Sequence, residues 1–274
     1  MRLKSLLGDY AVTRALTSGE VRSPDLDFDF AQVKLPQQAF KRVVRDLEFD
    51  FAELALVTYL LAKACGKPYR LLPVVLTARF QHPYLVCLSK NKLRPADLSG
   101  KRIGQRSYSV TTAAWIRGML MEEGVDLGSI RWITFEEPHV AEFRDPPNVE
   151  RAPAGKEMIA MLLAGEIDAA IAGEIPKDER IVPVYPDPEA AAQAWSKKHG
   201  AIQINHMAVV RQEMPFSLSQ DILGLLGQSR KAAGNPSMNP FGIEANRRNL
   251  EVAIDYVHRQ GMIPRRFSVE ELFE

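Results

Sequence analysis

The sequence predicts a two-lobed α/β protein in which mixed, mostly parallel sheets are flanked by helices. Strand-like and helix-like runs alternate along most of the 274 residues, and such alternation is typical of parallel sheets covered on both faces. These units are too many for one sheet of ordinary width. A polar, turn-rich stretch at 89–99 separates the earlier units from the later ones. We therefore expect a discontinuous lobe 1 at 1–88 and 207–274, and lobe 2 at 89–206.

Local patterns define the elements before the crossing. Phe28 and Phe30 alternate with acidic residues, as in a half-buried strand. Pro36 begins a helix, where its missing N–H costs no hydrogen bond, and Gly66 followed by Pro68 ends the next one. The expected strands are 2–7, 25–34, 49–51, 69–76 and 84–89, and the expected helices are 13–18, 36–47 and 54–65.

The later elements are read in the same way. The helix at 111–123 has Ser109 or Thr111 as its cap, and the return to lobe 1 is expected near Asn205 and His206. The expected strands are 101–104, 130–135, 169–172 and 201–211. The expected helices are 111–123, 155–164, 187–199, 217–233, 244–261 and 269–273.

Composition excludes several classes of partner. The chain has 35 Lys and Arg against 34 Asp and Glu, a formal charge of +1, so we expect no nucleic-acid surface. The longest apolar run, 54–61, is too short to span a bilayer, and we expect no membrane contact. Lys4 and Gly8 interrupt the first apolar run, which argues against a secretory signal and for a cytoplasmic protein. Cys65 and Cys87 are expected to be small buried hydrophobes.

Several segments resemble the 4,5-dihydroxyphthalate decarboxylase family. They are GDY at 8–10, TRAL at 13–16, FDFAEL at 49–54, YSVTTAAWIRG at 108–118, FGIEANR at 241–247 and EELF at 270–273. Two others, LSGKRIG at 98–104 and MLLAGEIDAA at 161–170, look like the second lobe of type II periplasmic-binding-protein folds. The family commonly has Arg-His after a Phe where this chain has Phe80, Gln81 and His82, so Gln81 removes one cation from the expected site. The segment 226–239 is also shorter than in the family.

The resemblance implies that CO2 is removed from an aromatic dicarboxylate with two ring hydroxyls, in the cleft between the lobes. That reaction needs a cation for the spectator carboxylate, a base for a hydroxyl and an acid for the ring carbon. Because the phenol itself accepts the electrons, we expect no cofactor. We also expect no metal, because the acid–base candidates show no metal-binding spacing.

His82, His206 and Glu53 are the acid–base candidates. Both histidines fall near predicted lobe crossings, and imidazole changes charge near neutral pH. A partly buried Glu53 would have a raised pKa and could act as the acid. Each also has a plain structural interpretation: a histidine packed near a hinge, or a carboxylate at a helix N-terminus.

The binding candidates are the arginines Arg14 and Arg117, which can grip a carboxylate through two hydrogen bonds, and groups near the helix that starts at Thr111. A helix N-terminus attracts anions, so Thr111 and Thr112 join the candidates. Tyr108 and Trp115 could flank an aromatic ring. The alternatives are surface charge for each arginine, simple capping for Thr111 and plain core for Trp115.

Two other functions stay open on the sequence. A non-catalytic solute-binding protein for a small carboxylate would use the same fold, since fold does not decide function. An enzyme of the menaquinone-precursor type has a similar fold, although no local motif favours it. In each case the expected partner is a small anionic molecule, aromatic for the decarboxylase, and the sequence leaves a homo-oligomer open.

Overall fold

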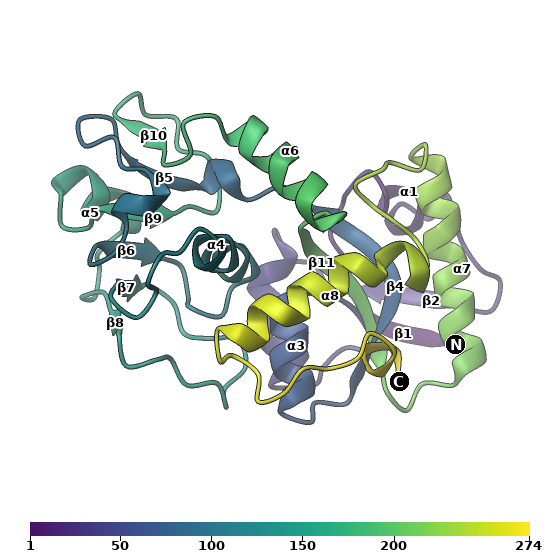
Figure 1. Cartoon of the computed structure of the whole chain (residues 1–274). Coiled ribbons are helices and arrows are strands. Elements are labelled where there is room, and N and C mark those ends of the chain that lie inside the picture. Colours follow the sequence, from purple (N-terminus) through teal and green to yellow (C-terminus); the bar gives the residue numbers. More distant parts are fainter.

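The computed structural model describes residues 1–274 and has two lobes, each built on one mixed sheet (Figure 1). In the first lobe the strands lie in the order β2 (Asp27–Phe30), β1 (Arg2–Leu6), β3 (Phe51–Ala55), β11 (Ile204–Arg211) and β4 (Tyr69–Ala78). The helices that follow strands of this lobe are α1 (Arg14–Thr17), α2 (Phe40–Val44), α3 (Leu56–Ala64), α7 (Phe216–Ala232) and α8 (Ile243–Arg259). Short 3-10 helices occupy Pro36–Ala39 and Glu270–Phe273.

The second lobe has a six-stranded sheet. Its strands lie in the order β10 (Ile181–Pro183), β5 (Leu85–Leu88), β9 (Ala169–Ile171), β6 (Arg102–Gln105), β7 (Arg131–Thr134) and β8 (Val149–Arg151). Its helices are α4 (Thr111–Glu122), α5 (Met158–Ala164) and α6 (Pro188–His199), and 3-10 turns occupy His82–Tyr84 and Pro95–Asp97. The predicted architecture of two mixed sheets flanked by helices is confirmed.

Both sheets mix parallel and antiparallel pairs because the chain passes between the lobes twice. Five strand pairs are parallel and four are antiparallel. The antiparallel pairs all involve β11, which returns to lobe 1 beside β3 and β4, or β5, which enters lobe 2 beside β9 and β10. The parallel pairs are joined by crossover connections, which contain a helix in every case except that between β7 and β8.

The crossing points differ from the predicted boundaries. β4 ends at Ala78 in the first sheet, and β5 already belongs to the second sheet. The chain therefore crosses to lobe 2 between β4 and β5, one strand earlier than the predicted boundary after residue 88. The return comes before Ile204, where β11 begins, so the boundary after 206 would cut a strand. Both errors have one cause: an apolar run shows that a strand exists but not which sheet it joins.

One local difference affects the site. The structure continues the strand through Phe51–Ala55, all five residues of which are buried, and starts α3 at Leu56. A strand buried on both faces reads as a continuous apolar run, which periodicity cannot separate from a buried helix. The sequence prediction had begun the helix at 54.

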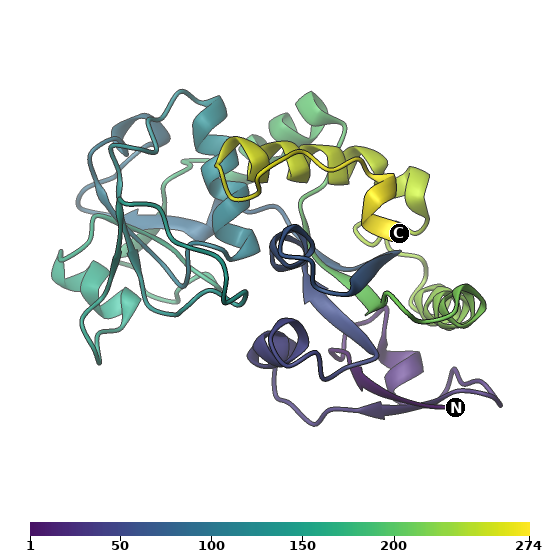
Figure 2. The same cartoon turned by 90° about the horizontal axis from the view of Figure 1, so that it is seen from below.

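The lobes share a continuous core. A cluster of 53 buried residues includes α3 from lobe 1, α4 from lobe 2 and α8. α8 runs along both lobes (Figure 2) and contacts both α3 and α4. No helix in the structure is long and apolar enough to cross a membrane.

Candidate functional site

A cleft of about 570 Å³ lies between the two lobes. Lobe 1 lines it with Tyr10, the start of α2, the ends of β3 and β4, and the start of β11. Lobe 2 lines it with Arg106, the start of α4, and the loops that follow β7 and β9. Strand ends and helix starts therefore converge on this space, which is the usual place for a ligand in open α/β sheets.

Glu53 sits on β3 behind the cleft, with no exposed side-chain surface. Its carboxylate accepts hydrogen bonds from the Gly8 backbone N–H at 2.8 Å and from the Tyr10 hydroxyl at 2.6 Å. Nδ1 of His206 is 2.5 Å from Oε1 of the same carboxylate. An ionised carboxylate only accepts hydrogen bonds, and here it faces three groups that can donate one. Burial and the neighbouring Glu53 charge raise the pKa of Tyr10, so its hydroxyl keeps its proton and remains a donor.

His206 projects from β11 toward the cleft. Glu53 holds Nδ1, and the ring packs edge-on against Phe40 with the centroids 5.3 Å apart. The side chain keeps 18% exposure and lines the cleft, and Nε2 has no protein partner. In the neutral ring, a hydrogen on Nδ1 leaves Nε2 as an acceptor. A histidine that a carboxylate orients in this way can accept a proton from a ligand.

A second histidine, His139, lines the same cleft from the loop after β7. Its Nδ1 lies 2.9 Å from the Thr58 hydroxyl on α3, and its ring stands edge-on to Phe40 with the centroids 5.5 Å apart. Burial, together with the nearby positive charges of Arg106 and Lys41, lowers the pKa of His139 to about 3. His139 is therefore a neutral imidazole at physiological pH.

One part of the lobe 2 wall, at Arg106 and the start of α4, is suited to an anion, whereas Glu136, Glu157 and Glu174 line other parts of it. The backbone N–H groups of Thr111 and Thr112 begin α4 without an acceptor, and no side chain caps them. Arg106 also lines the cleft, and its Nε is 3.6 Å from Glu136, a half-exposed pair. Arg79 lines the opposite side, where it stacks on Tyr84 with its guanidinium carbon 3.6 Å from the ring centroid. Unpaired helix donors beside arginine attract carboxylates.

Four of the predicted residues meet at this cleft. His206, Thr111 and Thr112 line it, and Glu53 stands behind His206. The Thr111 hydroxyl also accepts a hydrogen bond from the Val57 N–H of α3 at 3.1 Å, which joins the two lobes. Glu53 was predicted to be partly buried and to serve as an acid, but its side chain is fully buried and does not line the cleft. With its carboxylate enclosed by three donors, it can only position His206.

The two predicted arginines do not line the cleft. Arg14 is 65% exposed and pairs with Asp9 on the surface. Arg117 is fully buried, and its guanidinium donates to Gln260, Gln105 and the Tyr108 carbonyl. It lies six residues after Thr111, about 9 Å along the helix, so it is inside the lobe rather than at the cleft.

His82, Tyr108 and Trp115 also lie outside the cleft. His82 is 2% exposed against Tyr185, and burial lowers its pKa to about 4. The Tyr108 ring lies beneath the Arg117 guanidinium, whose central carbon is 3.7 Å from the ring centroid. Trp115 donates to the Ile204 carbonyl at 2.8 Å, which fastens α4 to the returning strand.

Gln81, expected to remove a cation from the site, instead joins the two crossing segments. Its backbone N–H donates to Gln203 at 2.6 Å and its side chain donates to Asn205 at 3.0 Å. The residue is fully buried. It belongs to the hinge, so the cationic character of the cleft does not depend on it.

Sequence reasoning missed Tyr10, His139, Arg79 and Arg106. A signal existed for Tyr10, which follows β1 at the same sheet edge as Glu53. Arg106 follows β6 and precedes α4, the position from which a polar side chain reaches a cleft. His139 lies in a loop with no pattern, and only the folded chain brings it to Phe40.

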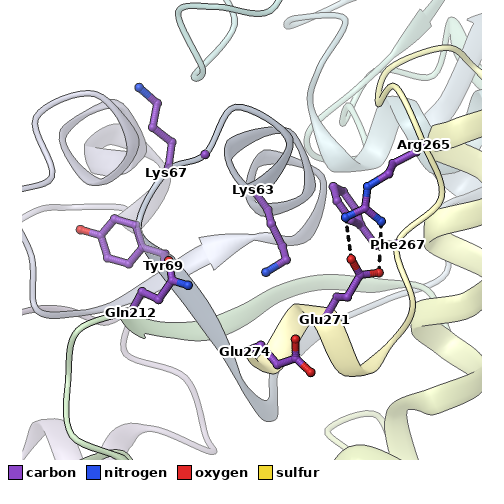
Figure 3. A pocket seen from close by; sticks show the side chains of 9 residues that line it. Lys63, Lys67, Tyr69, Gln212, Arg265, Phe267, Glu271 and Glu274 are labelled. Carbon is purple, nitrogen blue, oxygen red and sulfur yellow. Dashed lines mark hydrogen bonds and ion pairs between the residues drawn. The ribbon is translucent and has the colours of Figure 1, made fainter.

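Two further features carry less weight. A hollow of about 320 Å³ lies between the end of α3 and the C-terminal segment (Figure 3), where Arg265 is paired with Glu271 on the surface. It is smaller and more polar than the cleft, and none of the acid–base candidates lines it. No group of three or more His, Cys, Asp or Glu side chains is arranged to hold a metal ion.

Comparison with solved structures shows the fold. The chain is similar to the alkanesulfonate-binding protein SsuA of Xanthomonas axonopodis pv. citri, with a TM-score of 0.58 and 16% identity, over 99% of this chain and 96% of that one. It is also similar to the periplasmic aliphatic sulphonate binding protein SsuA of Escherichia coli, with a TM-score of 0.58 and 12% identity, over 100% and 91%. The fold is that of type II periplasmic binding proteins.

Comparison with curated sequences shows the family, although no family model matches the chain. The 4,5-dihydroxyphthalate decarboxylase of Comamonas testosteroni is 31% identical over 229 residues, which cover 78% of this chain and 69% of that protein. The 4,5-dihydroxyphthalate decarboxylase of Pseudomonas putida is 31% identical over 210 residues, which cover 71% and 81%. The resemblance read from the sequence is thereby confirmed, and the chain belongs to the 4,5-dihydroxyphthalate decarboxylase family.

Proposed function

We propose that the protein is a carboxy-lyase that removes CO2 from a hydroxylated aromatic dicarboxylate, such as 4,5-dihydroxyphthalate, bound in the cleft between the lobes. One observation carries the proposal: a histidine oriented by a buried carboxylate opens onto the cleft, opposite a wall suited to anions. Membership of the family supports the same substrate class. The fold alone does not support this function, because structures of the same fold include solute-binding proteins.

The electron flow follows from the substrate. Each carboxylate of 4,5-dihydroxyphthalate is para to a hydroxyl. When that hydroxyl loses its proton, electron density moves onto the ring carbon that bears the carboxylate. A proton from solvent adds to this carbon and gives a dienone. The bond to the carboxylate then breaks, CO2 leaves, and the bonding electrons restore the aromatic phenolate. The phenolate takes back the first proton, and the product is 3,4-dihydroxybenzoate.

His206 is the base in this scheme. Its free Nε2 accepts the hydroxyl proton, and Glu53 stabilises the imidazolium that results. After CO2 leaves, the imidazolium returns the proton to the phenolate. Arg106 and the start of α4 hold the carboxylates, so the positive charge lies away from the ring oxygen that must donate electrons.

The test is turnover of 4,5-dihydroxyphthalate by the purified protein. We expect CO2 and 3,4-dihydroxybenzoate in equal amounts, and one deuterium at the vacated ring carbon in D2O. His206→Asn should lower kcat by about 100-fold or more, whereas His82→Gln should leave it nearly unchanged because His82 does not reach the cleft. Tight binding without turnover by the folded protein would instead support the alternative, a solute-binding protein for a small carboxylate.

A further inference from the structure

Two imidazoles reach the cleft from opposite lobes and meet at one aromatic side chain. His206 comes from β11 of lobe 1 and His139 from the loop after β7 of lobe 2. Each ring stands edge-on to Phe40, at 5.3 Å and 5.5 Å between centroids. They are close enough that a positive charge on His206 contributes to lowering the pKa of His139. The two rings therefore lie within reach of a single ligand in the cleft.

The Nδ1 partners of the two rings differ, and this gives the rings different roles. Glu53 accepts from Nδ1 of His206 and leaves Nε2 as an acceptor. For His139 the partner is the buried Thr58 hydroxyl, whose sole hydrogen-bond partner is Nδ1. A buried hydroxyl proton without an acceptor is costly, so Thr58 donates to Nδ1. The neutral ring then carries its hydrogen on Nε2.

Nε2 of His139 is free to meet a ligand. It has no protein partner and is not fully buried. It therefore keeps contact with solvent, and the ring lines the cleft. Arg45 fixes the loop from the other side by donating to the backbone carbonyls of Pro138 and His139 at 2.6 and 2.8 Å. The donor is thus held in place before any ligand arrives.

We propose that His139 recognises the second of two adjacent ring hydroxyls by donating its Nε2–H to that oxygen, while His206 takes the proton from the first. This inference rests on the proposed function and assigns a residue that determines its specificity for a ring with two vicinal oxygens. The donated hydrogen bond strengthens as negative charge develops on the paired oxygens, so it assists ionisation as well as selection. No proton leaves His139 in any step.

The adjacent oxygen suits His139 better than a carboxylate does. Arg106 and the start of α4 already provide charged and unpaired donors for the carboxylates, whereas His139 and His206 both contact Phe40 on the other side of the cleft. A ring with one hydroxyl para to a carboxylate still meets the electronic need of the reaction. The reaction itself then does not need the second hydroxyl, which serves only for recognition by His139.

The experiment compares 4,5-dihydroxyphthalate with 4-hydroxyphthalate, which lacks only the second hydroxyl. His139→Leu should lower kcat/KM for the dihydroxy substrate by about 10- to 100-fold and change it by less than about 3-fold for the monohydroxy one. His139→Gln keeps an N–H donor and should recover part of the loss. Thr58→Val should weaken the same preference, because it leaves the tautomer of His139 unfixed. His82→Gln is the matched control, a buried histidine outside the cleft.

Each outcome decides the matter. An equal loss for both substrates, or no loss for either, would overturn the role of His139. If the wild-type protein turns over neither substrate, the proposed function fails, and calorimetric Kd values for the two compounds and for phthalate then test the recognition alone. A lower Kd for 4,5-dihydroxyphthalate than for 4-hydroxyphthalate, with the difference lost in His139→Leu, would support recognition by His139. Any other pattern of Kd values would reject it.

Discussion

His206 and Glu53 are diagonal neighbours on two paired strands, and their side chains meet at 2.5 Å between Nδ1 and Oε1. His206 is opposite Ala55 and Glu53 is opposite Ala208. The two residues are therefore on the same face of the sheet, at the spacing that lets long side chains touch. This register places a buried carboxylate behind a histidine at the edge of the cleft.

Glu53→Gln should lower kcat by about 100-fold or more while KM changes much less. The amide has one acceptor oxygen for three donors, and its NH2 group opposes the Nδ1–H of His206. The imidazole then loses its tautomer and its counter-charge. Steady-state kinetics measure the effect. Glu48→Gln, which removes a surface partner of Arg42, should leave both constants unchanged. Equal losses in the two variants would contradict the positioning role.

Arg106→Gln should raise KM by about 10-fold or more with a smaller fall in kcat. The guanidinium lines the cleft, and its only ion pair is a half-exposed contact with Glu136, which contributes little to stability. Its removal therefore weakens ligand binding more than folding. Arg14→Gln is the control, because Arg14 is on the surface beside Asp9. A KM that rises with Arg14→Gln but not with Arg106→Gln would contradict our placement of the anion site.

Stability should fall as pH decreases from about 6.5 toward 4. Burial lowers the pKa of His82 to about 4, and burial with nearby positive charges lowers that of His139 to about 3. In this window the unfolded chain binds protons that the native state does not, so the free energy of unfolding rises with pH. The slope is at most about 1.4 kcal/mol per pH unit for each histidine.

Urea unfolding at pH 7, 6 and 5 measures this dependence. His82→Gln should reduce the slope by removing one of the two groups. The native carboxylates with lowered pKa values, such as Glu122 and Asp168, lose stabilisation only at lower pH. An unfolding free energy that stays constant from pH 7 to pH 5 would show that neither histidine is buried in the neutral form.

Sequence reasoning predicted the layers, and four of its nine candidate residues lie at or directly behind the cleft. Alternating patterns indicate strands and helices, and these predicted both lobes. The end of an expected strand indicated Glu53, and the expected return between the lobes indicated His206. Position along a helix does not report depth, which is why Arg117 was misplaced. The sequence does not show that the end of α8 covers this part of α4, where Gln260 accepts a hydrogen bond from the buried guanidinium. His139 lies in an irregular loop whose path depends on contacts far along the chain.

Gly118→Ala should destabilise the protein because α4 and α8 approach each other closely at this position. A Cβ on Gly118 would lie 1.9 Å from the Tyr256 ring. That ring cannot easily move, because its hydroxyl accepts a hydrogen bond from Trp195 at 3.0 Å and the ring packs against Trp115 in a T-shaped arrangement. Overpacking of this kind costs about 1–3 kcal/mol, and urea unfolding measures it.

Gly224→Ala provides the matched comparison. Gly224 is also within a helix, α7, but a Cβ there would meet no atom within 4 Å. Alanine should therefore stabilise that helix by up to about 1 kcal/mol, because glycine is the poorer helix former. A lower free energy of unfolding for Gly118→Ala and a higher one for Gly224→Ala would show that close helix packing at Gly118 causes the loss. If Gly118→Ala were also stabilising, α4 and α8 would have to be farther apart than described, and the joint between the lobes would need another explanation.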